Sequence, residues 1–336
     1  MRLFVYEHLM AGGFGPQPPS SLLAEGRAML LAIVEDFAAA GHQVSTILHP
    51  TGGWPSDLPA SIELVEDEQA RRAALAQLAR AADWSLVIAP EIDGQLVACC
   101  QAVLESGGRL LGPSLAALAV TCDKHATAEA LRAAGVPVPD GNLLNPGDEP
   151  PEGFPFPAVL KPCDGAGSQD VQLIRARPSA ADFPQRTSPQ RLERFCPGQA
   201  ASVTLLVGAN SIYPLPPCRQ HLTDNGHFTY QGGSLPIEPD LAARAAALAR
   251  RAVAAVPGLF GYVGIDLVMG ADHAGRDDAV IEINPRLTTS YLGLRKLAVT
   301  NLASALLDVA QGQGPALGFR QSAVAFTAHG VTEIIE

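Results

Sequence analysis

Residues 280–291 read Val280-Ile281-Glu282-Ile283-Asn284-Pro285-Arg286-Leu287-Thr288-Thr289-Ser290-Tyr291. The β-branched residues before Pro285 predict a strand that runs into a loop. Because side chains two apart on a strand share a face, Glu282 and Asn284 point the same way, and Arg286 follows just past the strand end. A carboxylate beside an amide oxygen suits magnesium, and a neighbouring arginine suits a phosphate. An edge strand with a solvated polar face explains this stretch, taken alone, equally well.

Composition places the chain among acidic globular proteins. It has 336 residues, of which 47% are hydrophobic, and a net charge of −11. Such a chain lacks the basic face that non-specific nucleic-acid binding needs, so a nucleotide must be held by a few placed cations and metal ions. Six cysteines without a Cys-x-x-Cys pair indicate thiols in a reducing compartment. We expect a cytoplasmic protein without a membrane partner, because Glu7 interrupts a signal-peptide core and no apolar run reaches roughly 18 residues.

The first 112 residues alternate strand and helix patterns, which predicts a doubly wound α/β unit. The glycine loop at 11–15 lacks the spacing of a dinucleotide fingerprint and is followed by prolines, so we interpret it as a substrate-facing loop. Glu7, His8 and Glu91 lie at the carboxyl ends of strands, which border clefts, although capping or packing roles explain them as well. The predicted strands are 3–6, 44–48, 84–89 and 109–111, and the predicted helices are 20–40, 68–82 and 95–105.

Two lysines and two glycine loops stand out in the rest of the chain. Lys124 lies in a helical stretch, where a solvated lysine is the ordinary interpretation. Lys161 ends a strand, and the loop 165–168 leads into a second one. Its glycines would let backbone amides approach a polyphosphate, but an ordinary hairpin turn has the same pattern. Residues 231–234 are interpreted as a second glycine loop. Further strands are expected at 158–162, 171–174, 191–198, 202–207, 212–219, 227–231, 262–269 and 323–327, and helices at 240–256 and 297–312.

These features follow one order: helix lysine, strand lysine, glycine loop, glutamate-aromatic hinge, strand aspartate, then Glu-x-Asn-x-Arg. In this order they resemble the ATP-grasp ligases, from about Pro113 to about Gln311. The resemblance implies an α/β ATP-grasp fold with an N-terminal pre-ATP-grasp domain over 1–112. It also implies a central ATP-binding subdomain with a glycine-rich lid over 113–190, and a C-terminal subdomain with the metal ligands over 191–336.

The resemblance further implies how ATP is held. Lys124 and Lys161 would contact the α- and β-phosphates, and Glu193 would take the adenine amino group. The lid over the phosphates would be Gly165, Ala166, Gly167 and Ser168. The other adenine contacts would come from the backbone of Arg194 and Cys196, with Phe195 packed nearby.

The resemblance assigns the metal ligands and the catalytic cations as well. Asp266, Glu282 and Asn284 match ligands for Mg²⁺ or Mn²⁺, and Glu282 has two oxygens with which to bridge two ions. Arg286 would hold the γ-phosphate or the acyl phosphate formed from it, and Lys161 would help to neutralise the charge. These cations and ions screen the triphosphate, so that an anionic carboxylate can approach it.

Two positions depart from the family pattern. Gln199 follows the hinge where many relatives have an acid for the ribose, so the ribose contact falls to Gln199 or is lost. Gly264 stands where several relatives have an arginine, so transition-state charge must be neutralised by Arg286, a lysine or another arginine such as Arg219.

Several short stretches resemble the tyramine–glutamate ligase group of methanofuran and methylofuran synthesis. They are Phe4–Leu9 with Gly12-Gly13, Ala89-Pro90-Glu91, Cys218-Arg219-Gln220 and Tyr230-Gln231-Gly232-Gly233. This resemblance implies that the γ-carboxylate of glutamate is activated and that the amine of tyramine attacks it. Arg219 would then suit the α-carboxylate of glutamate, although a surface ion pair explains it equally well.

Three alternatives remain open at this point. They are an ATP-grasp ligase for another amino acid or peptide, a nucleotide-binding regulatory protein without turnover, and a dinucleotide oxidoreductase that uses the N-terminal unit. The expected partners are a small carboxylate and a small amine. The sequence leaves the oligomeric state open, and a homodimer is one of the assemblies it allows.

Overall fold

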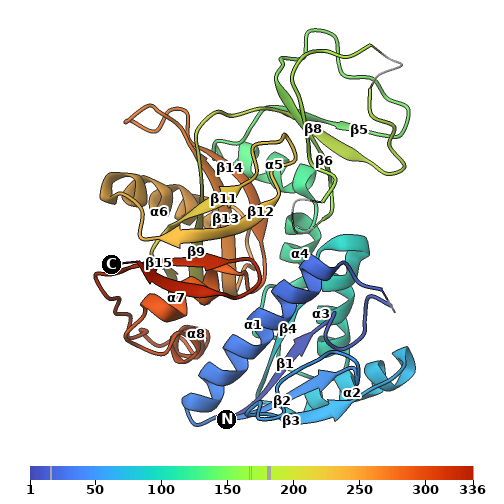
Figure 1. The fold of residues 1–336 in the computed structure, drawn as a ribbon, viewed down its shortest axis with the longest axis vertical. Coiled ribbons are helices and arrows are strands. Elements are labelled where there is room, and N and C mark those ends of the chain that lie inside the picture. Colours follow the sequence, from blue (N-terminus) through green and yellow to red (C-terminus); the bar gives the residue numbers. More distant parts are fainter. Residues whose placement is uncertain (16, 166, 168, 180–182, 336) are drawn as a thin grey trace.

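The computed structural model describes residues 1–15, 17–165, 167, 169–179 and 183–335. This part of the chain contains three sheets: an N-terminal sheet at the bottom of Figure 1, a small sheet at its top and the largest sheet at its left. The N-terminal elements are β1 (Arg2–Glu7), α1 (Ser20–Ala39), β2 (Gln43–Leu48), β3 (Ser61–Leu64), α2 (Glu68–Ala81), β4 (Trp84–Ile88), a 3₁₀ turn (Ile92–Gly94) and α3 (Gln95–Glu105).

The N-terminal sheet is parallel, in the order β3-β2-β1-β4. Leu3 and Val5 join the apolar core that contains α1, whereas Phe4 and Tyr6 join the core that contains α2 and α3. Helices therefore cover both faces, which confirms the doubly wound unit. The short, polar strand β3 is not predicted by the pattern, and the strand expected at 109–111 is reduced to a single bridge.

The small sheet is antiparallel, in the order β5-β8-β6-β7. The helical stretch before it is broken, because Asp123 has extended backbone and its carboxylate accepts hydrogen bonds from the His125 and Ala126 amides at 2.7 and 2.8 Å. Lys124 is thus the first residue of the second helix. The elements are α4 (Leu115–Thr121), α5 (Lys124–Ala133), β5 (Gly141–Leu144), β6 (Ala158–Pro162), β7 (Gln172–Ile174) and β8 (Gln190–Arg194).

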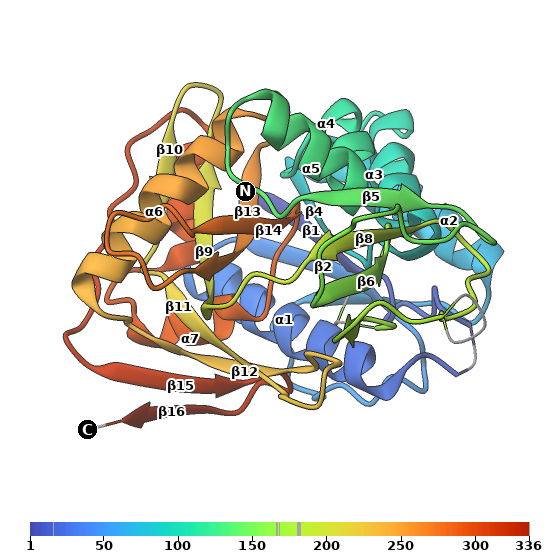
Figure 2. The ribbon, with the colours of Figure 1, turned by 90° about the horizontal axis from the view of Figure 1, so that it is seen from above.

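The largest sheet has the order β14-β13-β9-β11-β12-β15-β16, with β10 beside β9. The helix α6 packs on one face of it, and α7 and α8 pack on the other, where they also contact α1 (Figure 2). The elements are β9 (Gln199–Val207), β10 (Ile212–Pro214), β11 (Cys218–Leu222), β12 (Tyr230–Leu235), α6 (Pro239–Ala254), β13 (Gly261–Met269), β14 (Ala279–Asn284), α7 (Ser290–Leu297), α8 (Leu302–Ala310), β15 (Ala323–Thr327) and β16 (Thr332–Ile335).

Three predictions for this region are wrong. The glycines expected to form a loop at 231–234 lie inside β12, where neighbouring strands come so close that a Cβ on Gly233 would lie 2.6 Å from the Arg219 carbonyl oxygen. The helix expected at 297–312 is reduced to α8, which begins only at Leu302, and α7 before it is not predicted. The strand expected at 212–219 is divided into β10 and β11. The expected boundary between residues 190 and 191 falls inside β8. None of the described helices is long and apolar enough to span a bilayer.

Candidate active site

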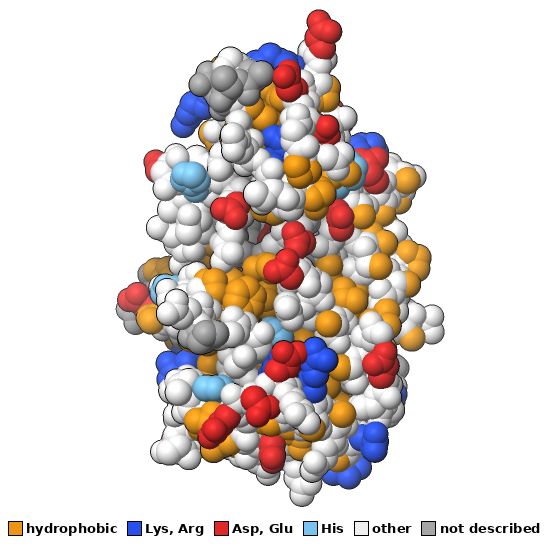
Figure 3. All heavy atoms as spheres, turned by 90° about the vertical axis from the view of Figure 1, so that its right-hand side faces the viewer, with side chains coloured by type: hydrophobic (Ala, Val, Ile, Leu, Met, Phe, Trp, Pro, Cys, Tyr) orange, Lys and Arg blue, Asp and Glu red, His pale blue; other side chains and the backbone are white. Residues whose placement is uncertain are grey.

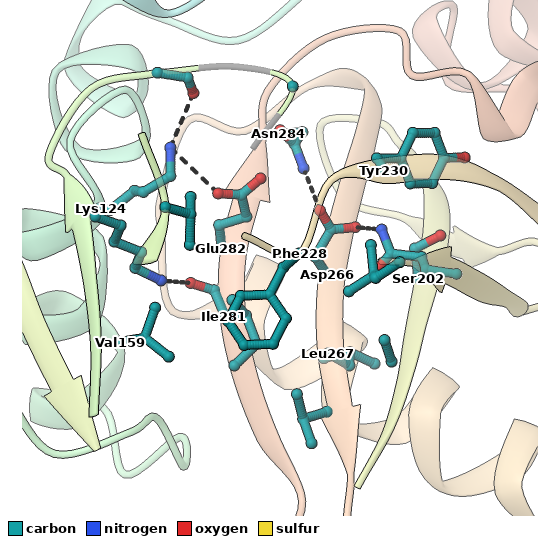
Figure 4. Close-up of a pocket in the computed structure, with 18 of the residues that line it drawn as sticks. Lys124, Val159, Ser202, Phe228, Tyr230, Asp266, Leu267, Ile281, Glu282 and Asn284 are labelled. Atoms are coloured by element: carbon teal, nitrogen blue, oxygen red, sulfur yellow. Dashed lines mark hydrogen bonds and ion pairs between the residues drawn. The ribbon is translucent and has the colours of Figure 1, made fainter. Parts of the chain in front are cut away.

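A large cleft opens where the three sheets meet, and its walls come from α1, α5 and strands of the small and largest sheets (Figure 4). It encloses about 1370 Å³ of empty space, including solvent at its mouth. Clefts of this kind, with convergent polar side chains, are the usual place of small-molecule sites, so this cleft is the candidate active site.

The strand pair β13–β14 places two carboxylates side by side at the floor of the cleft. Asp266 pairs with Glu282, and Gly264 pairs with Asn284. The Asn284 amide donates to Asp266 Oδ2 at 3.1 Å, and Gln220 Nε2 donates to Asp266 Oδ1 at 2.9 Å. The prediction that Glu282 and Asn284 share a face is confirmed, and the structure brings Asp266 to the same place.

These two carboxylates are half-buried side by side, and this perturbs the pKa of both of them. Burial and the neighbouring Glu282 charge raise the pKa of Asp266 well above its ordinary value. Burial alone would raise the pKa of Glu282, but Lys124 and Lys161 outweigh it and lower that pKa. Lys124 Nζ lies 3.2 Å from Glu282 Oε2.

The donor chemistry of this floor fits a divalent cation. Two carboxylates that repel each other gain from a shared cation, and an amide oxygen completes a hard donor set. Within the described ranges no three His, Cys, Asp or Glu side chains form a metal cluster. A cation here would therefore depend on the Asn284 oxygen together with Asp266 and Glu282.

The two predicted lysines reach the cleft from different elements. Lys124 Nζ also donates to the Gly165 carbonyl at 2.9 Å, which links α5 to the glycine loop (Figure 4). Lys161 is 3% exposed, and its ammonium lies 2.6 Å from Glu193 Oε1 and 3.4 Å from the Ile281 carbonyl. A β-bulge opposite Asp266 shifts the register of β14 near Ile281.

Glu193 is part of a buried charge network under the cleft. Its second oxygen accepts from Arg191 Nε at 2.8 Å, and Arg191 is fully buried. Arg191 also donates to the Pro139 carbonyl at 2.8 Å and contacts His125 Nδ1 at 2.9 Å. Both Glu193 oxygens are thus paired with cations, although each retains acceptor capacity.

The predicted hinge lines the cleft beside this network. The Arg194 amide donates to the Asp140 carbonyl at 2.8 Å, so only its carbonyl remains for an adenine contact. Phe195 and Cys196 also line the cleft. Phe228, which the sequence analysis does not single out, stacks on Phe195 with ring centroids 6.1 Å apart and planes 18° apart. The aromatic pair gives this end of the cleft a flat apolar surface.

The glycine loop lies between β6 and β7, as predicted. Gly165 and Gly167 line the cleft, whereas Ala166 and Ser168 lie outside the described residues. A Cβ on Gly167, which has φ +67°, would lie 2.9 Å from Leu22 of α1. The neighbouring Asp164 accepts from the Asp93 amide at 2.9 Å. The loop therefore meets the N-terminal unit.

Arg286 is held by the N-terminal unit. Its Nε and one terminal nitrogen donate to the two oxygens of Glu91 at 2.9 and 2.8 Å, and its other terminal nitrogen donates to the Leu287 carbonyl at 3.2 Å. The residues after it are fixed by buried hydroxyls, since Ser290 Oγ lies 3.0 Å from Thr204 Oγ1 and 3.0 Å from Tyr262 OH. A buried, bidentate pair orients the guanidinium strongly.

The space beside Gly264 is also occupied. A Cβ at this position would lie 2.8 Å from Thr288 Cγ2. Thr288 therefore fills the volume into which a larger residue would extend. The lysines and arginines that line the cleft are Lys124, Lys161, Arg194 and Arg286.

The structure does not bring Arg219 together with the other predicted site residues. Arg219 is exposed, does not line the cleft and donates to Gln199 Oε1 at 2.5 Å. Gln199 is also outside the cleft lining, and its side-chain oxygen is held by Arg219. The next residue of β11, Gln220, faces the cleft and holds Asp266, because successive strand side chains point to opposite faces.

Several lining residues are absent from the sequence prediction. Tyr230 accepts from Thr289 at 3.1 Å, and Figure 4 shows it on the far side of Asp266 from Lys124. Glu25 reaches the cleft from α1. Alternation along the strand could have shown that Gln220 points to the opposite face from Arg219. No local pattern in the sequence marks Glu25.

The surface agrees with the acidic composition. On the face shown in Figure 3, acidic side chains are scattered and basic ones occur in small separate groups, so the coloured side chains form no continuous basic patch there. Non-specific nucleic-acid binding requires such a patch.

Comparisons with known proteins agree with this geometry. A family model described as an ATP-grasp domain matches residues 121–290, and one described as a pre ATP-grasp 3 domain matches residues 44–118. Tyramine–L-glutamate ligase of Methanocaldococcus jannaschii is 26% identical over 333 residues, covering 97% of this chain and 94% of the relative. The ligase of the same name from Methanocaldococcus fervens is 26% identical over 300 residues, covering 87% of this chain and 89% of the relative.

A solved structure gives the same fold. It is described as an ATP-grasp superfamily protein from Archaeoglobus fulgidus, has a TM-score of 0.73 and 24% identity, and covers 96% of this chain and 92% of its own. The predicted ATP-grasp fold with a preceding α/β domain is confirmed. The ATP-grasp model spans just over half of the residues and includes both lysines, the glycine loop and the Asp266–Glu282 floor, so this chain belongs to the ATP-grasp family of ligases.

Proposed function

We propose that this enzyme joins the γ-carboxylate of glutamate to the amine of tyramine, with ATP converted to ADP and phosphate. The observation that carries the proposal is the convergence of Lys124, Lys161, Arg286 and the Asp266–Glu282 pair on one cleft. Support for the substrates comes from the two relatives named tyramine–L-glutamate ligase, which align along most of the chain. We propose the three-part domain division with the same function, with the second boundary placed after β8, because β8 pairs with β5 and β6 in the small sheet.

The reaction would proceed through an acyl phosphate. A carboxylate is a poor electrophile, and transfer of the γ-phosphoryl group gives it a good leaving group. The amine then attacks the acyl carbon, the C–N bond forms and the bond to the phosphate oxygen breaks. A closed glycine lid would keep water from the acyl phosphate, because excluding water suppresses hydrolysis of reactive intermediates.

The residues divide this work by position. The Phe195–Phe228 pair and the hinge of Arg194 and Cys196 would hold adenine, near Glu193. Lys124 and Lys161 would neutralise the α- and β-phosphates, and residues 165–168 would cover them. Arg286 would face the γ-phosphate and the acyl phosphate.

Asp266, Glu282 and Asn284 would hold magnesium or manganese at the cleft floor. When bound, such ions neutralise the triphosphate and stabilise charge that develops during phosphoryl transfer. Lys124 and Glu282 contribute an ion pair at the same place, so the lysine would remain close to the phosphates.

The substrates are tested by incubating the protein with ATP, magnesium, glutamate and a panel of amines. ADP release is followed, and the products are identified by mass spectrometry. We expect a γ-glutamyl amide of tyramine. Turnover with a different acid or amine would retain the ligase class and replace the substrates, whereas ATP binding without ADP release under any condition would favour a regulatory protein.

The metal assignment is tested with Glu282→Ala. We expect ADP formation to fall by at least about 10³-fold, because the residue would hold ions that carry several kcal/mol of transition-state stabilisation. Asp272→Ala is the matched control, since Asp272 lies outside the cleft and pairs with Arg276 on the surface. ADP formation by Glu282→Ala at the wild-type rate would contradict the metal assignment.

A further inference from the structure

Glu25 is a carboxylate in the cleft that has no polar partner among the described residues. It lies on α1, is half-buried and lines the same cleft as Asp266 and Arg286. No hydrogen bond or ion pair joins it to any of the described residues. A carboxylate held in a half-buried position without a cation is costly, so such groups usually have a ligand or a function.

The cation nearest to Glu25 is committed elsewhere. Arg286 influences Glu25 electrostatically, but two of its nitrogens bind Glu91 and the third binds the Leu287 carbonyl. It therefore supplies an attractive field without supplying a hydrogen bond. Glu25 is left with acceptor capacity on both oxygens, facing a cleft that must admit a second substrate.

The position of Glu25 separates it from the nucleotide end of the cleft. The phenol of Tyr230 is influenced electrostatically by Glu25 and by Asp266. Figure 4 places Tyr230 on one side of Asp266 and Lys124 on the other. A substrate beside Glu25 would thus lie past the cleft floor, where an acyl phosphate would be presented.

We propose that Glu25 binds the ammonium group of the attacking amine and accepts its proton, which makes Glu25 the general base of amide formation. This proposal rests on the ligase function proposed above. The amine arrives as an ammonium ion, which has no free electron pair and cannot attack. An unpaired carboxylate beside the acyl carbon would both attract that ion and deprotonate it.

The step balances in atoms and charge. One proton passes from the ammonium nitrogen to Glu25, and the nitrogen lone pair forms the C–N bond as the bond from the acyl carbon to the phosphate oxygen breaks. A second proton leaves the nitrogen with the departing phosphate, which becomes hydrogen phosphate. Glu25 then returns its proton to solvent.

The ionisation of Glu25 supports this role. Burial raises its pKa to about 7, against an opposing effect of Arg286. A base with a pKa near the working pH is the most effective at proton transfer. The other groups that face it are the Tyr230 phenol on β12 and, through Arg286, the Glu91 carboxylate.

The test separates the two half-reactions in Glu25→Gln. Hydroxylamine is uncharged at neutral pH and traps the acyl phosphate as a hydroxamate, so it needs no base. With ATP, magnesium and glutamate, we expect hydroxamate formation within about twofold of the wild type. With tyramine in place of hydroxylamine, we expect amide formation to fall about 10²-fold or more. Glu35→Gln on the same helix is the control, since Glu35 is exposed and outside the cleft.

A pH series distinguishes a base from a structural residue. We expect the deficit of Glu25→Gln to shrink as the pH approaches the pKa of the free amine, because the uncharged amine then becomes abundant. An amide rate within twofold of the wild type would overturn the proposal, as would an equal loss of hydroxamate and amide. A KM for glutamate that is higher in Glu25→Gln than in the wild type in the hydroxylamine assay would also overturn it. That result would mean that Glu25 binds the amino group of glutamate. If the wild type forms no hydroxamate with any acid, the ligase function itself fails.

Discussion

Replacing Glu91 by glutamine tests whether the N-terminal unit holds Arg286 in place. The side chains of Glu91 and Arg286 are 5% and 12% exposed, and two hydrogen bonds of 2.8 and 2.9 Å join them. Removing one partner of a buried ion pair costs about 3–5 kcal/mol. Glutamine keeps one acceptor oxygen, so we expect a loss of about 2–3 kcal/mol.

The loss is measured as a melting temperature under matched conditions. For a chain of this size we expect Glu91→Gln to melt roughly 5 °C below the wild type. Glu66→Gln is the control, because Glu66 is exposed and should change stability by less than about 0.5 kcal/mol. In a double-mutant cycle with Arg286→Met, the double variant should lose at least about 1 kcal/mol less stability than the sum of the two single variants. A melting temperature within 1 °C of the wild type, or fully additive losses, would refute the reasoning.

Two further predictions concern Glu7 and β11. Burial raises the pKa of Glu7 from 4.5 to about 7, so the folded chain binds this proton more tightly than the unfolded chain. The protonated Glu7 therefore contributes stability that is complete below about pH 4.5 and is lost as the pH rises through about 7. Between pH 5 and pH 8, the stability of Glu7→Gln relative to the wild type, measured by thermal melts, should therefore rise by up to about 3 kcal/mol. An equal change of melting temperature with pH in both proteins would count against this. Arg219→Ala should leave ADP formation unchanged, whereas Gln220→Ala, which frees Asp266, should lower it about tenfold or more; the reverse order of effects would restore Arg219 to the site.

Much of the site follows from local patterns. Glu282 and Asn284 share a face because strand geometry sets a period of two, whatever the strand packs against. The polar side chain of Asp123 before an apolar helix could have marked the break that places Lys124 at a helix start. The glycine loop between two strands was predictable for the same kind of reason, since both strands and loop are contiguous in sequence.

Orientation across strands was less predictable. Arg219 and Gln220 are neighbours, and the sequence resemblance favoured the arginine because its charge suits a carboxylate. Which of them faces the cleft depends on how β11 pairs with β9 and β12, and a shift by one residue would have exchanged them. Gly232 and Gly233 were expected in a loop because glycines commonly mark turns. In the structure they lie in β12, where β15 comes too close for a Cβ, and this approach depends on residues far away in the sequence.

The amino-acid sequence by itself determined the α/β alternation, the order of the family features and the shared face of Glu282 and Asn284, because each depends on residues within one or two turns or strands. Only the tertiary structure decided that Glu25 of the N-terminal unit reaches the cleft and that Glu91 of the same unit pairs with Arg286. Contacts between residues so far apart depend on how whole sheets and helices pack together, and no local period or spacing encodes that packing.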